Sequence, residues 1–309
     1  MNIITLTLNP AIDVHCYTEH FQPYRENLAT VTSRDIGGKG INISRALTAN
    51  KIGNTALIVL GQEDKASFCR AMDAEGLTYR EIILPGKVRE NITLHTSGAP
   101  ETRISFTGFS ADDTLIDRVE SELLRLLDRG DILTLTGRNP EGIGMPRMKK
   151  MLANLKTMGV RIVLDSRSFS LSDLLEIRPW LIKPNEEEIA SYASIDVHDF
   201  PTAKNAAEHL HARGIENVMI SLGARGALLC SPQGCFAAQA PSIEAISTIG
   251  AGDSSIAGFC AATELGLDAP DRLRYAVSYG SAACMVMGTQ APRVQDVQAL
   301  LGQIEIFTL

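Results

Sequence analysis

The chain has 309 residues, of which 45% are hydrophobic and 21% are charged, and its formal net charge is −7. This length and composition suffice for one large α/β domain, alone or with a small appendage, around a substantial core. Because the basic residues are spread along an acidic chain, the composition argues against a nucleic-acid-binding surface.

The cysteines and the N-terminal segment indicate the cellular compartment. The six cysteines show neither C-x-x-C nor zinc-ligand spacing. The opening MNIITLTLNP lacks the basic start and the cleavage site of a signal peptide. Since no apolar run is long enough to span a bilayer, we expect a reduced, cytoplasmic protein that does not bind membranes.

Strand-like and helix-like segments alternate along most of the chain. β-Branched and apolar runs predict strands at 2–8, 55–61, 131–137, 160–165 and 216–223. Apolar residues at helical spacing predict helices within 38–53, 64–76, 113–130, 145–159 and 202–214. This alternation predicts parallel βαβ units with helices on both faces of one sheet.

Two regions interrupt the alternation with short extended runs, such as VRENITLHT and TRISFTG. They predict a small second sheet that projects from the main one. We therefore divide the chain into a main α/β domain (1–11, 35–88 and 108–309) and a small β-sheet unit (12–34 and 89–107).

The segment STIGAGDSSIAGF, residues 247–259, places small residues before an acid at the start of a predicted helix. The N–H groups of Gly250, Ala251 and Gly252 and the helix dipole together form an anion site. Asp253 can accept a proton from an attacking hydroxyl, which suits phosphoryl transfer. The alternative is a tight turn in which Asp253 only caps the helix. The spacing fits neither a dinucleotide fingerprint nor a P-loop.

Three further segments carry polar groups at chain turns. DIGGKGINIS, residues 35–44, offers Lys39 and Asn42 to a sugar hydroxyl or a phosphate. KPNEEEI, residues 183–189, offers Lys183, Asn185 and Glu188, which suit a phosphate and a hydrated Mg²⁺. SLGARGALL predicts a strand, a glycine turn and a second strand, a hairpin able to lie against a nucleotide.

The segments GGKGIN, KPNEEE, SLGARGA and STIGAGD have the order and spacing of the ribokinase-like (PfkB) carbohydrate kinases, and the chain resembles this family over nearly its whole length. The opening TLTLNPAIDV and the segment GDILTLTGRNPEG resemble its branch of 1-phosphofructokinases and tagatose-6-phosphate kinases. The resemblance implies a three-layer α/β/α domain with a mostly parallel sheet and a β-sheet lid.

The resemblance also implies an activity. We expect ATP-dependent phosphorylation of a phosphorylated ketose, with fructose 1-phosphate converted to fructose 1,6-bisphosphate as the first candidate. Tagatose 6-phosphate, fructose 6-phosphate and another anionic sugar are alternatives within this class. A non-catalytic sugar-phosphate sensor that kept the fold is the alternative from a different class.

Roles carried over from the family place the reaction at Asp253, as the catalytic base, and at the anion hole of Gly250, Ala251 and Gly252. The residues expected to hold the sugar and its phosphate are Asp13, Gly38, Lys39, Asn42 and Arg89. Those expected around ATP and Mg²⁺ are Asp165, Lys183, Asn185, Glu188, Ser221 and Gly223. The carbonyls of Ser247 and Ile249, with the later segment VMGTQ, resemble a site for a monovalent cation such as K⁺.

The sequence departs from the family pattern at two arginines, Arg138 and Arg167, where relatives have serine. Arginine suits bidentate binding of phosphate or carboxylate, so we expect Arg138 to contact an anionic group of the substrate. The alternative is that both arginines pair with nearby acids such as Glu141. Arg25 lies where such kinases supply a basic residue across a lid-mediated homodimer, although a solvated surface arginine is equally compatible.

Overall fold

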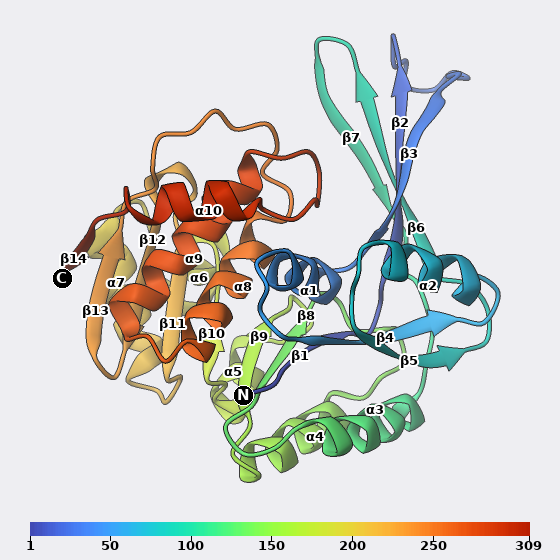
Figure 1. Cartoon of the computed structure of the whole chain (residues 1–309). Helices are drawn as coiled ribbons and strands as arrows, with labels where there is room; N and C mark the ends of the chain where they lie inside the picture. The colour runs from blue at the N-terminus through green and yellow to red at the C-terminus, as the bar shows by residue number, and fades with distance from the viewer.

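A ten-stranded sheet forms the centre of the protein, and a four-stranded sheet projects from it (Figure 1). The computed structural model describes the backbone of residues 1–309 and the side chains of residues 1–98 and 100–309. From edge to edge the large sheet contains β14 (Ile306–Thr308), β13 (Gly234–Ala238), β12 (Ala227–Ser231), β11 (Asn217–Ser221), β10 (Leu181–Ile182), β9 (Arg161–Asp165), β8 (Ile132–Thr136), β1 (Ile3–Thr7), β4 (Thr55–Gly61) and β5 (Tyr79–Leu84).

The pairs between β5 and β11 are parallel, whereas those from β11 to β14 are antiparallel. The central strands β1 (IITLT) and β8 (ILTLT) are buried along their whole length. Such continuous burial is typical of parallel strands that carry helices on both faces. The segment SLGARGALL forms the antiparallel pair β11–β12 around a short turn, as its glycines predict.

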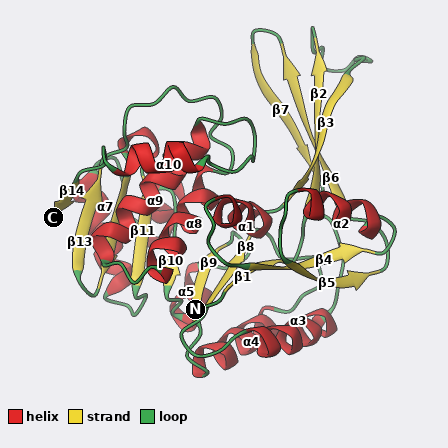
Figure 2. Ribbon diagram, in the orientation of Figure 1, coloured by secondary structure: helices red, strands yellow, loops and turns green.

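Helices cover both faces of the large sheet, as Figures 1 and 2 show. One face carries α1 (Lys39–Ala49), α2 (Lys65–Ala74), α8 (Ala251–Glu264), α9 (Ala269–Cys284) and α10 (Val294–Leu301). The other carries α3 (Asp113–Leu126), α4 (Met145–Thr157), α5 (Leu171–Ile177), α6 (Glu186–Ala193) and α7 (Phe200–His211). The expected three-layer α/β/α fold with a mostly parallel sheet is confirmed.

The central helix α8 is buried on nearly every side and packs against α9. A β-carbon on Gly258 would lie 2.4 Å from the carbonyl oxygen of Tyr275, so only glycine permits this close approach. Helix α1 packs along the other side of α8. The start of α8, with its acid, is thereby held rigidly beside α1.

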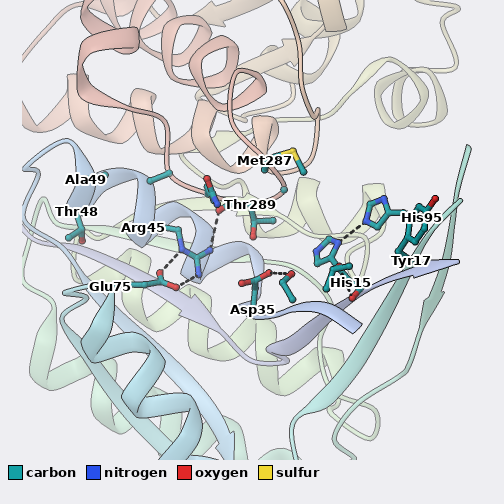
Figure 3. Close-up of a pocket in the computed structure, with 15 residues that line it drawn as sticks. His15, Tyr17, Asp35, Arg45, Thr48, Ala49, Glu75, His95, Met287 and Thr289 are labelled. Atoms are coloured by element: carbon teal, nitrogen blue, oxygen red, sulfur yellow. Dashed lines mark hydrogen bonds and ion pairs between the residues drawn. The ribbon is translucent and has the colours of Figure 1, made fainter. Parts of the chain in front are cut away.

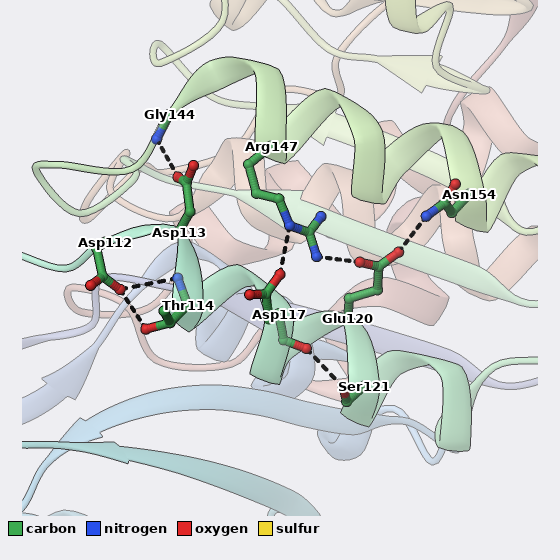
Figure 4. Close-up of polar contacts among 9 residues, drawn as sticks. All are labelled: Asp112, Asp113, Thr114, Asp117, Glu120, Ser121, Gly144, Arg147 and Asn154. Atoms are coloured by element: carbon green, nitrogen blue, oxygen red, sulfur yellow. Dashed lines mark hydrogen bonds and ion pairs between the residues drawn. The ribbon is translucent and has the colours of Figure 1, made fainter.

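On the opposite face a polar network joins α3 to α4 (Figure 4). Asp112 caps α3 by accepting from the N–H of Thr114 at 3.0 Å. Arg147 of α4 donates to Asp117 at 2.7 Å and also to Glu120. This network contains none of the expected site residues.

The small sheet contains β3 (Thr30–Gly37), β2 (Ala11–Thr18), β6 (Arg89–Thr96) and β7 (Ala99–Ser105), in that order. Strand β2 pairs antiparallel with β3 and parallel with β6, so residues from two distant parts of the sequence share one surface. The segments expected to form a second sheet do so. The exact division of the chain into a main domain and a lid stays a prediction.

One cysteine pair differs from the expected reduced state. Cys230 of β12 and Cys235 of β13 face each other across the hairpin and form a disulfide, with their Cα atoms 4.2 Å apart. Their spacing in the sequence matches no motif, so only the strand register brings them together. Among the described residues, no helix combines the length and apolar character that crossing a membrane requires.

Candidate active site

The candidate site lies where the carboxyl ends of central strands meet the N-terminal ends of α1 and α8. Lys39, the first residue of α1, donates from Nζ to Oδ2 of Asp165, the last residue of β9, at 2.8 Å. Asn42, one turn further along α1, donates from Nδ2 to Oδ2 of Asp253 at 2.8 Å. In open α/β sheets this edge is where ligands bind.

Asp253 is the third residue of α8 and is only 6% exposed. Burial raises the pKa of its carboxyl to about 6, although Lys39 and Asn42 oppose this effect. Gly250, in a left-handed conformation, is the residue that precedes the helix, and no side chain caps it. The alternative in which Asp253 only caps the helix is therefore wrong: its carboxylate contacts Asn42 instead.

The start of α8 is also where a second cation lies. A β-carbon on Gly252 would be 3.0 Å from Nζ of Lys183, so this ammonium sits against the helix N-terminus. The first N–H groups of a helix have no partner within the helix. The backbone of Gly250, Ala251 and Gly252 and the Lys183 ammonium thus make one electropositive surface beside Asp253.

Asp165 is as deeply buried as Asp253, at 8% exposed, but its environment differs. Burial alone would raise the pKa of Asp165, yet the charges of Lys183 and Lys39 hold it below its ordinary value. Burial likewise opposes the charge of Lys39, but Asp165 and Asp253 raise its pKa above the ordinary value. Lys39 therefore interacts with two acids whose pKa values are shifted in opposite directions, down for Asp165 and up for Asp253.

The small sheet supplies the other wall of the site. Asp13 of β2 accepts from Nδ2 of Asn91, its neighbour on β6, at 2.8 Å. Its other oxygen lies over Gly37, where a β-carbon would be 2.1 Å away. Gly38 follows with a φ of 140° and immediately precedes α1. Asn91 could not be recognised from the sequence, because only the strand register shows that it faces Asp13.

Arg89 lies at the junction of the two sheets. Its guanidinium donates to the carbonyl of Phe106 at 2.9 Å, with longer contacts of 3.4 Å to those of Asn9 and Pro10. Burial lowers the pKa of Arg89, Asp13 opposes this effect, and the nearby charge of Arg138 adds to it. Arg138 is exposed and makes no ion pair among the described residues. Arg138 therefore lies close enough to Arg89 to act on its pKa.

Arg167 behaves differently from Arg138. Its Nε donates to Oε1 of Glu188 at 3.0 Å. Arg167 therefore pairs with an acid, as the alternative interpretation expected, but the acid is Glu188 and not Glu141. Glu188 also exchanges hydrogen bonds with Asn185 at the start of α6. Asp165 and Glu188 line a cavity of about 20 Å³, together with Lys39 and Lys183.

These side chains fit a hydrated Mg²⁺ better than a fully protein-bound one. No three His, Cys, Asp or Glu side chains cluster as metal ligands among the described residues. Mg²⁺ characteristically keeps several waters and takes one or two carboxylates plus substrate phosphates. Asp165 and Glu188 supply two carboxylates, and the small cavity has room for about one water.

A larger cavity, of about 840 Å³, opens on the other side of the α8 N-terminus. Asn185, Ser221 and Gly223 line it, as do Ala251 and Gly252. Its size is that of a site for a drug-sized ligand or cofactor. Nearby, a β-carbon on Gly250 would lie 3.7 Å from Cα of Thr289, so the loop bearing Ser247 and Ile249 meets the VMGTQ segment. Arg25, at the exposed far end of the small sheet, lies outside the site within this one chain.

A third cavity, of about 1030 Å³, lies between the small sheet and α1 (Figure 3). His15, Asp35 and His95 approach it from the small sheet, and Arg45 and Thr289 from the main domain. Arg45 was not among the expected site residues, because in the sequence it reads as an ordinary surface position of a helix.

Comparisons with known proteins identify the family of the chain. The family model described as "pfkB family carbohydrate kinase" matches residues 6–296. The 1-phosphofructokinase of Rhodobacter capsulatus is 31% identical over 311 residues, covering 100% of this chain and 98% of the relative. The 1-phosphofructokinase of Vibrio cholerae is 28% identical, covering 99% of this chain and 97% of the relative.

Solved structures show the same fold. Phosphofructokinase-2 from Escherichia coli, in complex with potassium, has a TM-score of 0.91 and 25% identity and covers 98% of both chains. The same enzyme in complex with fructose-6-phosphate has a TM-score of 0.90 at 24% identity. The chain therefore belongs to the pfkB family of carbohydrate kinases, which transfer a phosphoryl group to a sugar hydroxyl.

Proposed function

We propose that this kinase phosphorylates a ketose that already carries a phosphate, with fructose 1-phosphate as the first candidate and fructose 1,6-bisphosphate as the product. The observation that carries the proposal is that the charges of Arg138 and Asp13 both act on the pKa of Arg89 at the junction of the two sheets. Two arginines near each other favour an anionic ligand. The curated relatives named 1-phosphofructokinase support this choice of substrate.

The sugar is held between the two sheets in this proposal. Asp13, oriented by Asn91, accepts hydrogen bonds from sugar hydroxyls beside the backbone of Gly38. Arg138 binds the phosphate of the substrate together with Arg89. Lys39, between Asp165 and Asp253, is placed to contact the group in transfer. The small sheet acts as a lid whose closure excludes water.

Asp253 takes the proton of the acceptor hydroxyl. A carboxyl with a pKa of about 6 is mostly ionised at neutral pH and is a stronger base than an ordinary aspartate. The N–H groups at the start of α8 and Lys183 stabilise the negative charge of the phosphoryl group as it moves. Such help from a general base contributes about 10²–10⁴ in rate.

ATP, Mg²⁺ and a monovalent cation complete the proposal. The cavity lined by Ser221 and Gly223 takes the nucleotide, with Asn185 and Lys183 toward its phosphates. Bound ATP and Mg²⁺ supply the phosphoryl group and neutralise its charge. Asp165 and Glu188 hold waters of the ion. The loop of Ser247 and Ile249 would hold K⁺ against the VMGTQ segment, and the potassium complex of the Escherichia coli relative supports this assignment.

An ADP-release assay tests the substrate. Purified protein with ATP and Mg²⁺ meets fructose 1-phosphate, fructose 6-phosphate, tagatose 6-phosphate and unphosphorylated sugars. We expect the highest kcat/KM with fructose 1-phosphate. A preference for fructose 6-phosphate, the ligand of the solved relative, would replace the first candidate within the same class. If none of the sugars supported ATP turnover, the result would favour the sugar-phosphate sensor.

Variants of one arginine test how the substrate phosphate is read. Arg138→Ser is expected to raise KM for the phosphoketose about tenfold, because a charge-assisted contact is lost. Arg125→Ser is the matched control: Arg125 is also exposed, but it pairs only with Glu122 on α3. An Arg138→Ser variant with the KM and substrate preference of the wild type would overturn the assignment of Arg138.

We also propose that the kinase is a cytoplasmic homodimer joined through the small sheet. Tyr24 and Leu28, at the far end of that sheet, are almost fully exposed apolar side chains, and such patches favour a partner surface. Arg25 lies between them and would reach the partner's site. Sedimentation of Leu28→Glu beside the wild type tests this: a dimer in both would contradict it.

A further inference from the structure

Helix α1 presents three polar side chains at three-residue spacing, Lys39, Asn42 and Arg45. Residues three apart are neighbours on a helix surface, so the three form one row. The first contacts Asp165 and the second contacts Asp253. The third, Arg45, contacts neither acid and lines the cavity between α1 and the small sheet (Figure 3).

All five N–H groups of the Arg45 guanidinium have partners. Glu75, at the end of α2, accepts two of them, from Nε at 2.5 Å and from Nη2 at 2.9 Å. Nη2 also donates to the carbonyl of Ile36 at 3.0 Å, and Nη1 to that of Thr289 at 3.2 Å. The fifth contact is from Nη1 to Oδ1 of Asn42 at 3.0 Å.

The fifth contact decides how the Asn42 amide is oriented. With its oxygen accepting from Arg45, its nitrogen points to Asp253 and donates at 2.8 Å. The flipped amide would place an NH₂ group against a guanidinium, which has no acceptor, and an oxygen against a carboxylate, which has no donor when ionised. Only one orientation satisfies both neighbours.

The guanidinium itself is held in place. The Arg45 side chain is 11% exposed, and its two-pronged contact with Glu75 matches the fork geometry that fixes arginine on carboxylates. Its two carbonyl partners lie near the end of β3 and on the 286–290 segment. Arg45 therefore joins the inner end of the small sheet, that segment and the amide that contacts the base.

We propose that Arg45, anchored by Glu75, is a positioning residue that holds Asn42 in the single orientation that donates to Asp253. The proposal rests on the proposed role of Asp253 as the base. Arg45 touches neither that base nor, in the geometry above, the transferred group. Its effect is on the chemical step, and the nucleotide cavity, which it does not line, is left unchanged.

Steady-state kinetics of Arg45→Lys test the proposal. Lysine keeps the charge but loses the fork, and we expect kcat to fall about tenfold while KM for ATP stays within twofold. Arg147→Lys is the matched control, because Arg147 also has low exposure and two contacts with carboxylate oxygens, but these join α3 to α4 (Figure 4). We expect its kcat to stay within twofold. Thermal melting checks that both variants are folded. Equal kcat values for the two folded variants would overturn the proposal.

A double-mutant cycle asks whether Arg45 acts through Asn42. If it does, Arg45→Lys changes kcat less than twofold when Asn42 is already alanine. A further tenfold loss in that background would show an independent role and overturn the proposal. Glu75→Gln, which keeps the acceptor but removes the charge, is expected to lower kcat about two- to threefold and serves if Arg45→Lys does not fold.

The pH profile of kcat adds a readout that a purely structural role would not move. Asp253 faces Lys39, Asp165, Lys183 and Asn42, and loss of the Asn42 donor raises the pKa of Asp253. The acid limb of Arg45→Lys should therefore lie at higher pH than that of the wild type and of Arg147→Lys. Asp253→Asn separates the two proposals: an inactive Asp253→Asn with an unaffected Arg45→Lys overturns only the role of Arg45.

Discussion

The start of α8 and the end of β9 each bury one aspartate in the same cleft, yet the two carboxyls differ in their affinity for a proton. Burial raises the pKa of Asp253 to about 6. Asp165, equally buried, keeps a pKa below the ordinary value because Lys183 and Lys39 lie beside it. Environments that push two pKa values apart mark different chemical roles.

The difference follows from which side chains each element brings. Asp253 lies in the first turn of the buried helix α8 and is desolvated, and it accepts a hydrogen bond from the neutral amide of Asn42. Asp165 has the ammonium of Lys39 at 2.8 Å. Asp253 is thereby suited to take a proton, whereas Asp165 stays charged and suits a cation. Four predictions test this difference between the two aspartates.

The largest expected effect on stability is that of Asp253→Asn. Asp253 has a pKa near 6 in the folded state and about 3.9 when unfolded, so the folded state binds the proton more tightly. Wild-type stability therefore falls as pH rises from about 4 to 6, and the loss persists above that window. We expect the variant to exceed the wild type by about 2–3 kcal/mol at pH 8 and to lose this advantage near pH 4. Urea unfolding at both pH values measures it, and a pH-independent difference would contradict the assignment.

Lys39→Met should have the next largest effect. It leaves Asp165 buried with one cation fewer, and we expect a loss of about 1–3 kcal/mol in the free energy of unfolding. Lys87→Met is the control, because Lys87 and its partner Glu63 are both exposed, at 70% and 58%. An equal loss in both variants would show that the cleft pair is no more than a surface ion pair.

Lys39 and Asp165 should move the pH profile in opposite directions. Lys39 lowers the pKa of Asp253 and Asp165 raises it, so Lys39→Met shifts the acid limb of kcat to higher pH and Asp165→Asn shifts it to lower pH. The remaining activity of each variant, followed from pH 5 to 8, measures the shift. Acid limbs that shift in the same direction in both variants would show that a group other than Asp253 titrates.

The smallest effect is expected at the exposed pair Arg34–Glu90 on the small sheet. Arg34→Gln should change the free energy of unfolding by less than about 1 kcal/mol, because exposed ion pairs are screened by water and salt. Thermal unfolding at low and high salt measures this. A loss as large as that of Lys39→Met would mean that burial does not distinguish the two ion pairs.

Much of the fold could be predicted from the sequence because its signals are local. Apolar runs such as IITLT and the helical spacing after Gly38 follow directly from burial on one or both faces. The small sheet was likewise visible as extended runs without helical spacing. Glycines before Lys39 and Asp253 mark the two helix starts that meet in the site.

The contacts between distant segments could not be predicted in the same way. Asn91 meets Asp13 only through the β2–β6 register, and Cys235 meets Cys230 only through the hairpin register. The partner of Arg167 proved to be Glu188 rather than Glu141, because α6 begins beside the end of β9. Arg45 carried no motif at all, and its role depends on groups contributed by three other segments.

The role of Asp253 as the base is tested most directly by measuring ADP release by Asp253→Asn and by the wild type. The substrate is the phosphoketose that the wild type turns over fastest. Asparagine keeps the shape and a contact with Asn42 but cannot take the proton. We expect the kcat of Asp253→Asn to be lower than that of the wild type by a factor of about 10²–10⁴, with KM values nearly unchanged. Wild-type turnover in the folded variant would contradict the role of Asp253 as the base.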